Sequence, residues 1–251
     1  PTANKHKPPP QTMPPHAIQI QDLVVHAPTG PKKAHPKILG PLSLNLDPGE
    51  HVLLVGPSGS GKTTLLRSIA GLNAPTSGTI TIQGLKATEG PKQLIKPEHR
   101  NLGYLFQDGA LWPHKTVHRT LDFVLSVDRS PRRERNDRIA EILELVELTG
   151  MEERLPSELS GGEAQRLNLA RALITNPKLV LFDEPLGPLD APLRAALLER
   201  IQFVQQKQGW CALHVTHDPA GATGIATRTI HIDGGQIVSD ERHSSDTQAP
   251  A

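Results

Sequence analysis

The chain has 251 residues, enough for one large or two modest domains with a buried core. Its 27 lysines and arginines nearly balance its 26 aspartates and glutamates, so the formal net charge of +1 gives no general electrostatic reason to expect nucleic acid as a partner. A single cysteine excludes an internal disulfide, and no stretch reaches the roughly 18–20 apolar residues of a membrane span.

The first part of the chain predicts an unstructured leader followed by strands. Residues 1–16 are rich in proline and polar residues, which predicts disorder. Strands are expected over 17–25 and 41–46, joined by a loop over 27–40 that holds prolines, glycines and lysines. A turn over 47–50 then leads to the first segment with chemical character.

That segment is GPSGSGKT, residues 56–63, between an apolar strand over 51–55 and a helix over 64–70. It fits the phosphate-loop (Walker A) pattern, in which backbone N–H groups and a helix N-terminus surround a polyphosphate. Lys62 is predicted to reach the β- and γ-phosphates and Thr63 to hold Mg²⁺ through its hydroxyl. The plainer alternative is a strand-to-helix turn that needs glycine. The predicted nucleotide-binding residues are Gly56, Pro57, Ser58, Gly59, Ser60, Gly61, Lys62, Thr63 and Thr64.

The middle of the chain changes from strand to helix. A strand bounded by glycines is expected over 77–84, and a long charged segment leads to another strand over 102–107. The pattern over 116–155 is helical, and Pro156 ends it. Its apolar stripe consists of Ile139, Leu143, Val146 and Leu148.

A serine and two glycines, Ser160, Gly161 and Gly162, precede a predicted helix over 163–174. Alone, they indicate either a second anion-binding helix start or a plain helix cap. One fold needs a single cradle for its nucleotide. A second cradle about a hundred residues later therefore suggests that two copies share two nucleotides, each copy giving one cradle to either site.

Two acids follow the apolar strand over 179–182. Asp183 and Glu184 emerge at its carboxyl end, where ligands bind in open α/β sheets. Asp183 is predicted to bind Mg²⁺ and Glu184 to polarise the attacking water, with an Asp-Glu helix cap as the alternative. A further strand over 211–215 and a hairpin over 229–238 complete the ordered chain, and His214 and His231 within these strands are interpreted as structural.

Together these motifs resemble the nucleotide-binding subunits of ATP-binding cassette (ABC) transporters over about residues 18–240. LSGGEAQR at 159–166 is similar to the family signature, and LFDEP at 181–185 to its Walker B strand. The resemblance implies that Gln107 is the Q-loop glutamine, with a catalytic and metal-binding role. It also implies that Asp190 is the D-loop aspartate at the nucleotide and that His217 is the catalytic switch histidine.

The implied fold is α/β: a P-loop NTPase core with a mostly parallel sheet and flanking helices, an antiparallel β subdomain and a helical signature-motif subdomain. The cassette is expected over 17–240, with the helical subdomain at about 108–160 and a flexible tail over 241–251. The resemblance further implies a head-to-tail dimer around two ATP molecules with Mg²⁺, in which the signature residues of one subunit face the phosphate loop of the other.

The implied function is ATP hydrolysis coupled to transport at the cytoplasmic face of the inner membrane. The expected partners are separate transmembrane permease subunits, a second copy of the chain and, for an importer, a solute-binding protein. The strings LFQDGALWPHKTV, ELSGGEAQRLNLARAL and DEPLGPLDAPLR resemble prokaryotic importers, so import is favoured. An exporter or lipid-transport cassette, a soluble ABC ATPase of DNA repair or translation, and a non-hydrolysing regulatory subunit stay open, and the solute is not indicated.

Three positions need separate comment. The family stacks adenine on an aromatic residue where this chain has Ala27, beside His26, so we expect a weaker adenine contact unless His26 or a neighbouring chain substitutes. Pro188 stands in the D-loop where a small residue is usual. The apolar segment over 109–113 is either a groove for a permease helix or ordinary helical core.

Overall fold

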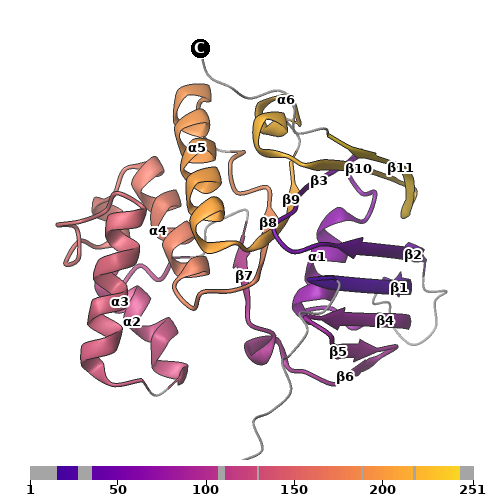
Figure 1. Cartoon of the computed structure of the whole chain (residues 1–251), viewed down its shortest axis with the longest axis horizontal. Helices are drawn as coiled ribbons and strands as arrows, with labels where there is room; N and C mark the ends of the chain where they lie inside the picture. Colours follow the sequence, from indigo (N-terminus) through magenta and orange to yellow (C-terminus); the bar gives the residue numbers. More distant parts are fainter. Residues whose placement is uncertain are drawn as a thin grey trace, which may run out of the picture.

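The computed structural model describes residues 16–27, 36–106, 111–128, 130–187, 189–216 and 219–243. Helix α1 (Lys62–Ala70) lies between two β-sheets, and further helices cover the opposite side of the larger sheet (Figure 1). This arrangement confirms the predicted α/β class with an antiparallel β subdomain and a helical subdomain.

The larger sheet has six strands in the order β11-β10-β3-β9-β8-β7. Its members are β3 (His51–Val55), β7 (Leu102–Leu105), β8 (Leu179–Asp183), β9 (Cys211–Val215), β10 (Arg228–Asp233) and β11 (Gln236–Arg242). Neighbours from β10 to β7 run parallel, and β11 pairs antiparallel with β10. Because parallel strands end at the same edge of a sheet, the segments that follow β3 and β8 share that edge.

The burial of strand β3 on both faces explains why its sequence is apolar without alternation. Leu53 and Val55 belong to the hydrophobic cluster on the helical side of the sheet. Val52 and Leu54 belong to the second cluster, which contains α1 and the smaller sheet. A strand buried on both faces needs apolar side chains at every position, as expected for the interior of a parallel sheet.

The smaller sheet is antiparallel, in the order β2-β1-β4-β5-β6. Its strands are β1 (Ile18–His26), β2 (Lys37–Leu46), β4 (Ser77–Ile82), β5 (Leu85–Glu89) and β6 (Lys92–Gln93). The loop predicted over 27–40 was too long, because β2 begins at Lys37. Strands β5 and β6 lie in the segment expected to be a charged connection. They bury only Ala87 and Thr88, so they carry almost no apolar alternation.

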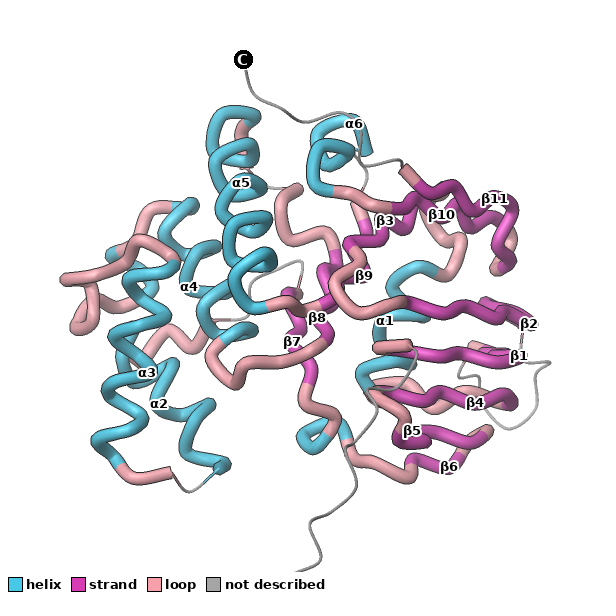
Figure 2. Tube along the Cα trace, in the orientation of Figure 1, coloured by secondary structure: helices cyan, strands magenta, loops and turns pink. Residues whose placement is uncertain are grey.

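The helical side consists of α2 (Val117–Leu125), α3 (Arg132–Leu145) and α4 (Gly161–Leu173), with α5 (Ala191–Gln208) beside β8 and the short α6 (Pro219–Ala222). Four 3-10 turns complete the described elements: η1 (Pro97–His99), η2 (Ser126–Asp128), η3 (Pro156–Glu158) and η4 (Thr223–Ile225). Figure 2 shows α2, α3 and α4 on the side of β7 and β8 away from α1.

The apolar stripe predicted within 116–155 is confirmed, since Ile139, Leu143, Val146 and Leu148 are all buried in the helical cluster. The predicted helical stretch is divided, however, because α2 and α3 are separated around Pro131. Proline has no N–H for a helix interior and is tolerated at a helix start. Among the described residues, no helix is both long enough and apolar enough to span a bilayer.

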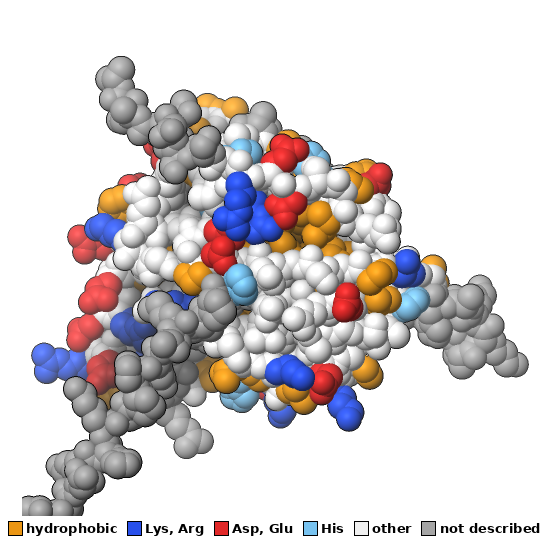
Figure 3. All heavy atoms as spheres, turned by 45° about the vertical axis from the view of Figure 1, so that its right-hand side comes forward, with side chains coloured by type: hydrophobic (Ala, Val, Ile, Leu, Met, Phe, Trp, Pro, Cys, Tyr) orange, Lys and Arg blue, Asp and Glu red, His pale blue; other side chains and the backbone are white. Residues whose placement is uncertain are grey.

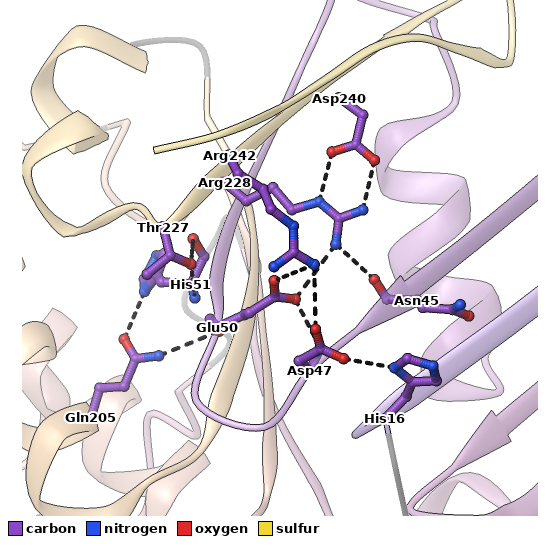
Figure 4. Close-up of polar contacts among 10 residues, drawn as sticks. All are labelled: His16, Asn45, Asp47, Glu50, His51, Gln205, Thr227, Arg228, Asp240 and Arg242. Carbon is purple, nitrogen blue, oxygen red and sulfur yellow. Dashed lines mark hydrogen bonds and ion pairs between the residues drawn. The ribbon is translucent and has the colours of Figure 1, made fainter. Parts of the chain in front are cut away.

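A buried arginine attaches the terminal hairpin to the rest of the fold. Arg228 donates from Nε and Nη2 to the two carboxylate oxygens of Asp240, both at 2.6 Å, and from Nη1 to the backbone oxygen of Asn45 at 2.9 Å (Figure 4). Glu50 Oε2 lies 3.5 Å from the same Nη1. The arginine thus joins β10 and β11 to β2 and to the turn before β3.

Arg242 extends this ion-pair network past the predicted domain end at 240, because β11 continues to this residue. Its guanidinium lies 3.2 Å from Glu50 Oε1 and 3.3 Å from Asp47 Oδ2. His16 Nδ1 lies 2.6 Å from Asp47 Oδ1, and this hydrogen bond is the main cause that lowers the Asp47 pKa. On the face shown in Figure 3, acidic and basic side chains form a mixed cluster near the upper centre, and further charged side chains lie along the left side and the lower edge.

Candidate nucleotide-binding and hydrolysis site

The glycines after β3 let the backbone pass very close to neighbouring segments before α1 begins. At Gly56 (φ 149°), an added Cβ would overlap the carbonyl oxygen of Ile232, so no larger residue fits there. Gly61 is the N-cap of α1 with φ 101°, a left-handed conformation that glycine adopts without strain. Ser60 Oγ is buried without a hydrogen-bond partner among the described residues. A phosphate oxygen would supply that partner.

Lys62 is the cation of this loop. Its side chain is buried, and its ammonium donates to the carbonyl oxygens of Gly56 at 2.8 Å and Pro57 at 3.0 Å. Burial lowers the pKa of Lys62, while the carboxylates of Glu184 and Asp183 act in the opposite direction. The lysine therefore bridges the loop and faces the acids predicted to complete the site.

Thr63 and Asp183 meet across the fold, as a magnesium site of this kind requires. The Thr63 hydroxyl donates to Asp183 Oδ1 at 2.8 Å, and Asp183 is buried at the end of β8. Both groups are oxygen donors, which Mg²⁺ prefers, and Mg²⁺ typically takes one or two protein ligands together with substrate phosphates. The described residues include no cluster of three or more His, Cys, Asp or Glu able to hold a metal. The pair fits Mg²⁺ bound jointly with a polyphosphate.

Glu184 leaves β8 in an uncommon backbone conformation. Its φ is 54°, in the left-handed region, and its N–H donates to the carbonyl oxygen of Val215 on β9 at 3.2 Å. The residue lines a cavity of about 190 Å³ together with His214 and Thr216. Non-glycine residues held at positive φ concentrate at functional sites. The geometry is consistent with the predicted general-base role.

The signature residues lie elsewhere. Ser160 is the N-cap of α4 and forms a capping box: its hydroxyl accepts from the N–H of Glu163 at 3.3 Å, and Glu163 accepts from the N–H of Ser160 at 2.7 Å. Gly161 is exposed, and Gly162 packs so closely that an added Cβ would lie 2.6 Å from the Leu193 side chain. Because α4 and α1 lie on opposite sides of β7 and β8 (Figure 2), this helix start and the phosphate loop do not share one site within the chain.

A groove beside α1 includes Ala27, where the adenine base of ATP is expected to bind. It has a volume of about 910 Å³, and its lining includes Ala27, Ile38, Thr64 and Arg67. His26 also lines it, with its Nδ1 2.9 Å from the hydroxyl of Thr76. These residues offer no aromatic ring other than the imidazole of His26.

The remaining predicted residues have different outcomes. Asp190 caps α5, where its carboxylate accepts from the N–H of Leu193 at 2.9 Å. Gln107, His217 and Pro188 lie outside the described residues, as do residues 109 and 110 of the segment 109–113, while Leu111 packs against the helical cluster. Tyr104, which belongs to none of the predicted motifs, also reaches the site: its hydroxyl donates to Asp183 Oδ2 at 2.9 Å. Its only signal was that it is the one tyrosine of the chain, within the strand predicted over 102–107.

Comparison with known proteins agrees with this geometry. The Fe(3+) ions import ATP-binding protein of Pasteurella multocida is 42% identical over 201 residues, 80% of this chain and 56% of that protein. The sulfate/thiosulfate import ATP-binding protein of Thermosynechococcus vestitus is 43% identical over 196 residues, covering 78% and 57% respectively. The spermidine/putrescine import ATP-binding protein of Acidothermus cellulolyticus is 42% identical and matched over 50% of its length. The chain thus spans about half the length of these curated relatives.

Among solved structures, a bacterial ABC transporter cassette in dimeric form superposes with a TM-score of 0.79 at 29% identity, covering 90% of this chain and 98% of that one. The same cassette in a post-hydrolysis dimer bound to ADP and Pi gives a TM-score of 0.78. The sequence profile described as "ABC transporter" matches residues 39–187. The chain therefore belongs to the ABC transporter family.

Proposed function

We propose that the chain is the ATP-hydrolysing subunit of an ABC importer. The observation that carries this proposal is the convergence of Lys62, Thr63, Asp183 and Glu184 at one edge of the sheet, while the signature helix start lies away from them. A binding module without catalysis would not need an acid at the position of Glu184.

ATP binding follows from the loop. The backbone N–H groups of Gly56 and of residues 58–64, together with the N-terminus of α1, would hold the phosphates, while Pro57 has no N–H to give. Lys62 would exchange its contacts with two loop carbonyls for contacts with the β- and γ-phosphates. Thr63 and Asp183, together with Gln107, would hold Mg²⁺. That ion supplies charge neutralisation at the phosphate oxygens.

Hydrolysis would then proceed by in-line attack. A water oxygen attacks the γ-phosphorus, one of its protons passes to Glu184, and the bond to the bridging oxygen breaks to release ADP and phosphate. His217 is proposed to contact the γ-phosphate. Lys62 remains a cation facing the transferred group, close to the carboxylates that oppose loss of its proton.

The helix start at Ser160 lies away from the phosphate loop of its own chain, so it would act on a nucleotide only in a second copy of the chain. We propose a head-to-tail homodimer in which Ser160, Gly161 and Gly162 of one chain close over the γ-phosphate held by its partner, with Asp190 near the shared boundary. The exposed positions of Ser160 and Gly161 at the start of α4 support this arrangement. A dimeric cassette of the same fold provides the precedent.

The names of the relatives favour import over export. All three relatives are described as import ATP-binding proteins, but for Fe(3+), sulfate/thiosulfate and spermidine/putrescine, so the solute is not indicated. Transmembrane permease subunits and a solute-binding protein are the proposed partners, and the cytoplasmic face of the inner membrane is the proposed location. An exporter, a lipid transporter or a non-transport ABC ATPase is the alternative.

Phosphate release from the purified chain with Mg²⁺ and ATP tests the catalytic part of the proposal. We expect turnover by the native chain and almost none by Glu184→Gln. Co-purification with membrane subunits and a solute-binding protein tests the importer assignment. Activity without any membrane partner in the complex isolated from cells would favour a non-transport ATPase.

A further inference from the structure

Both oxygens of the Asp183 carboxylate are held by hydroxyl groups from other elements. Thr63 of α1 donates to Oδ1 at 2.8 Å, and Tyr104 of β7 donates to Oδ2 at 2.9 Å. The hydrogen bond from Thr63 to Oδ1 is part of the proposed metal site. The hydrogen bond from Tyr104 to Oδ2 lies outside the residues assigned to that site.

The tyrosine is fixed from several sides. Strands β7 and β8 pair in register with Tyr104 opposite Leu181, two residues before Asp183. The ring of Phe106 lies 4.3 Å from the Tyr104 ring, centroid to centroid. In this contact the Tyr104 hydroxyl is the donor and the Asp183 carboxylate, which has only acceptor oxygens when ionised, is the acceptor. The hydrogen bond therefore has a defined direction, from tyrosine to carboxylate.

The same hydroxyl connects Asp183 to the groove beside α1. The Arg67 guanidinium also interacts with Tyr104, and Arg67 lines the groove. An apolar ring without a hydroxyl would be enough to fill the space that Tyr104 occupies on β7. A half-buried hydroxyl at this position can instead orient a carboxylate, in the way that outer-sphere partners orient metal ligands.

We infer that Tyr104 is a positioning residue for Mg²⁺: it holds Oδ2 of Asp183 so that the carboxylate faces Thr63 and the metal bound with ATP. This inference rests on the proposed function of the same site. It adds Tyr104 of β7 to the residues that determine the affinity for Mg²⁺.

The test compares ATP affinity with excess Mg²⁺ and with EDTA, measured by calorimetry in the Glu184→Gln background so that hydrolysis does not interfere. The dissociation constant of ATP in EDTA divided by that in excess Mg²⁺ reports how much affinity Mg²⁺ contributes. Tyr104→Phe should lower this ratio about tenfold, while affinity in EDTA stays unchanged. In the hydrolysing chain the same variant should raise the KM for Mg²⁺ with little change in kcat at saturating Mg²⁺.

Thr120→Val is the matched control, because it also removes a buried hydroxyl, on α2, which has no hydrogen-bond partner among the described residues. It should leave the ratio unchanged. If Tyr104→Phe also leaves it unchanged while the parent chain gains affinity from Mg²⁺, the role of Tyr104 is wrong and the proposed function stands. If the parent chain gains nothing from Mg²⁺, both fail.

A second measurement avoids any variant of the site. Because Tyr104 is the only tyrosine in the sequence, 3-fluorotyrosine incorporation labels it alone. Its ¹⁹F resonance should shift when Mg²⁺ is added to the ATP-bound chain. A resonance that moves with ATP in EDTA and not with Mg²⁺ would overturn the inference even if Tyr104→Phe failed to fold.

Discussion

His51 on β3 and His214 on β9 form a buried pair, with His51 Nε2 3.2 Å from His214 Nδ1. The amide orientation of Gln205 fixes the direction of this contact. Its Nε2 donates to the carbonyl oxygen of Trp210 at 3.0 Å, so its Oε1 accepts from His51 Nδ1 at 2.9 Å. His51 Nε2 is then the acceptor, and His214 Nδ1 carries the donated proton. Both rings are neutral, in agreement with a structural role for His214.

This pair predicts acid sensitivity. Burial lowers the pKa of His51 to about 4, and burial together with His51 lowers the pKa of His214. In the unfolded chain both would bind protons below a pH of about 6.5, so the free energy of unfolding falls as the pH drops from there toward 4. His51 alone would account for about 3 kcal/mol over that interval. Urea unfolding at several pH values measures the slope.

The double substitution His51→Phe with His214→Phe should flatten that slope, because it removes both buried imidazoles found among the described residues. His231→Phe is the control, since His231 is exposed on β10. An equal slope in the double variant and the native chain would rule out these histidines as the cause.

Glu184→Gln should separate binding from catalysis. The amide keeps the size of the side chain but cannot accept the proton of the attacking water, so turnover should fall about 10²–10⁴-fold while ATP binding persists. Lys62→Ala should instead abolish tight ATP binding, since it removes the loop cation. Phosphate release and equilibrium binding distinguish the two, and near-native turnover by Glu184→Gln would refute its assignment as the base.

Ser160→Asp tests the shared site without weakening α4. Aspartate caps helices about as well as serine, but it would place a negative charge toward the partner's triphosphate. We expect ATP-dependent pairing in the Glu184→Gln background to disappear, as measured by light scattering. Thr116→Asp is the matched control, because Thr116 caps α2 through the N–H of Arg119. Unchanged pairing by Ser160→Asp would contradict the head-to-tail arrangement.

Ala27→Tyr should strengthen the contact with adenine. Ala27 lines the groove beside α1, and stacking a base on an aromatic ring contributes about 1–3 kcal/mol. ATP affinity should rise about tenfold, corresponding to about 1.4 kcal/mol. Binding measurements with ATP and with the bare triphosphate check this, because only ATP should gain. An equal gain for both ligands would mean that the ring acts elsewhere.

Arg228→Met should destabilise the fold by about 3 kcal/mol, since it leaves the carboxylates of Asp240 and Glu50 without their buried partner. The Arg228 side chain is 10% exposed and that of Arg242 is 65% exposed. Arg242→Met therefore should cost less than about 1 kcal/mol. Chemical unfolding compares them, and equal losses would show that burial does not set the strength of these pairs.

The chemical motifs could be read from sequence because each is local. Glycine spacing before Lys62, an apolar run ending in Asp183 and a serine before two glycines each encode a backbone shape within a few residues. Strand β3 and the helical stripe were equally evident, since burial on a regular element imposes a period. Strand β5 and the edge strand β6 were missed because short, largely exposed strands carry no such period.

The contacts between distant residues were decided only by the tertiary structure. Tyr104 and Asp183 are 79 residues apart, and His51 and His214 are 163 apart. No local pattern encodes such a pair, because the pairing depends on which strands become neighbours and in which register. The order β3-β9-β8-β7 brings these side chains together, and packing on both faces of the sheet then keeps them there.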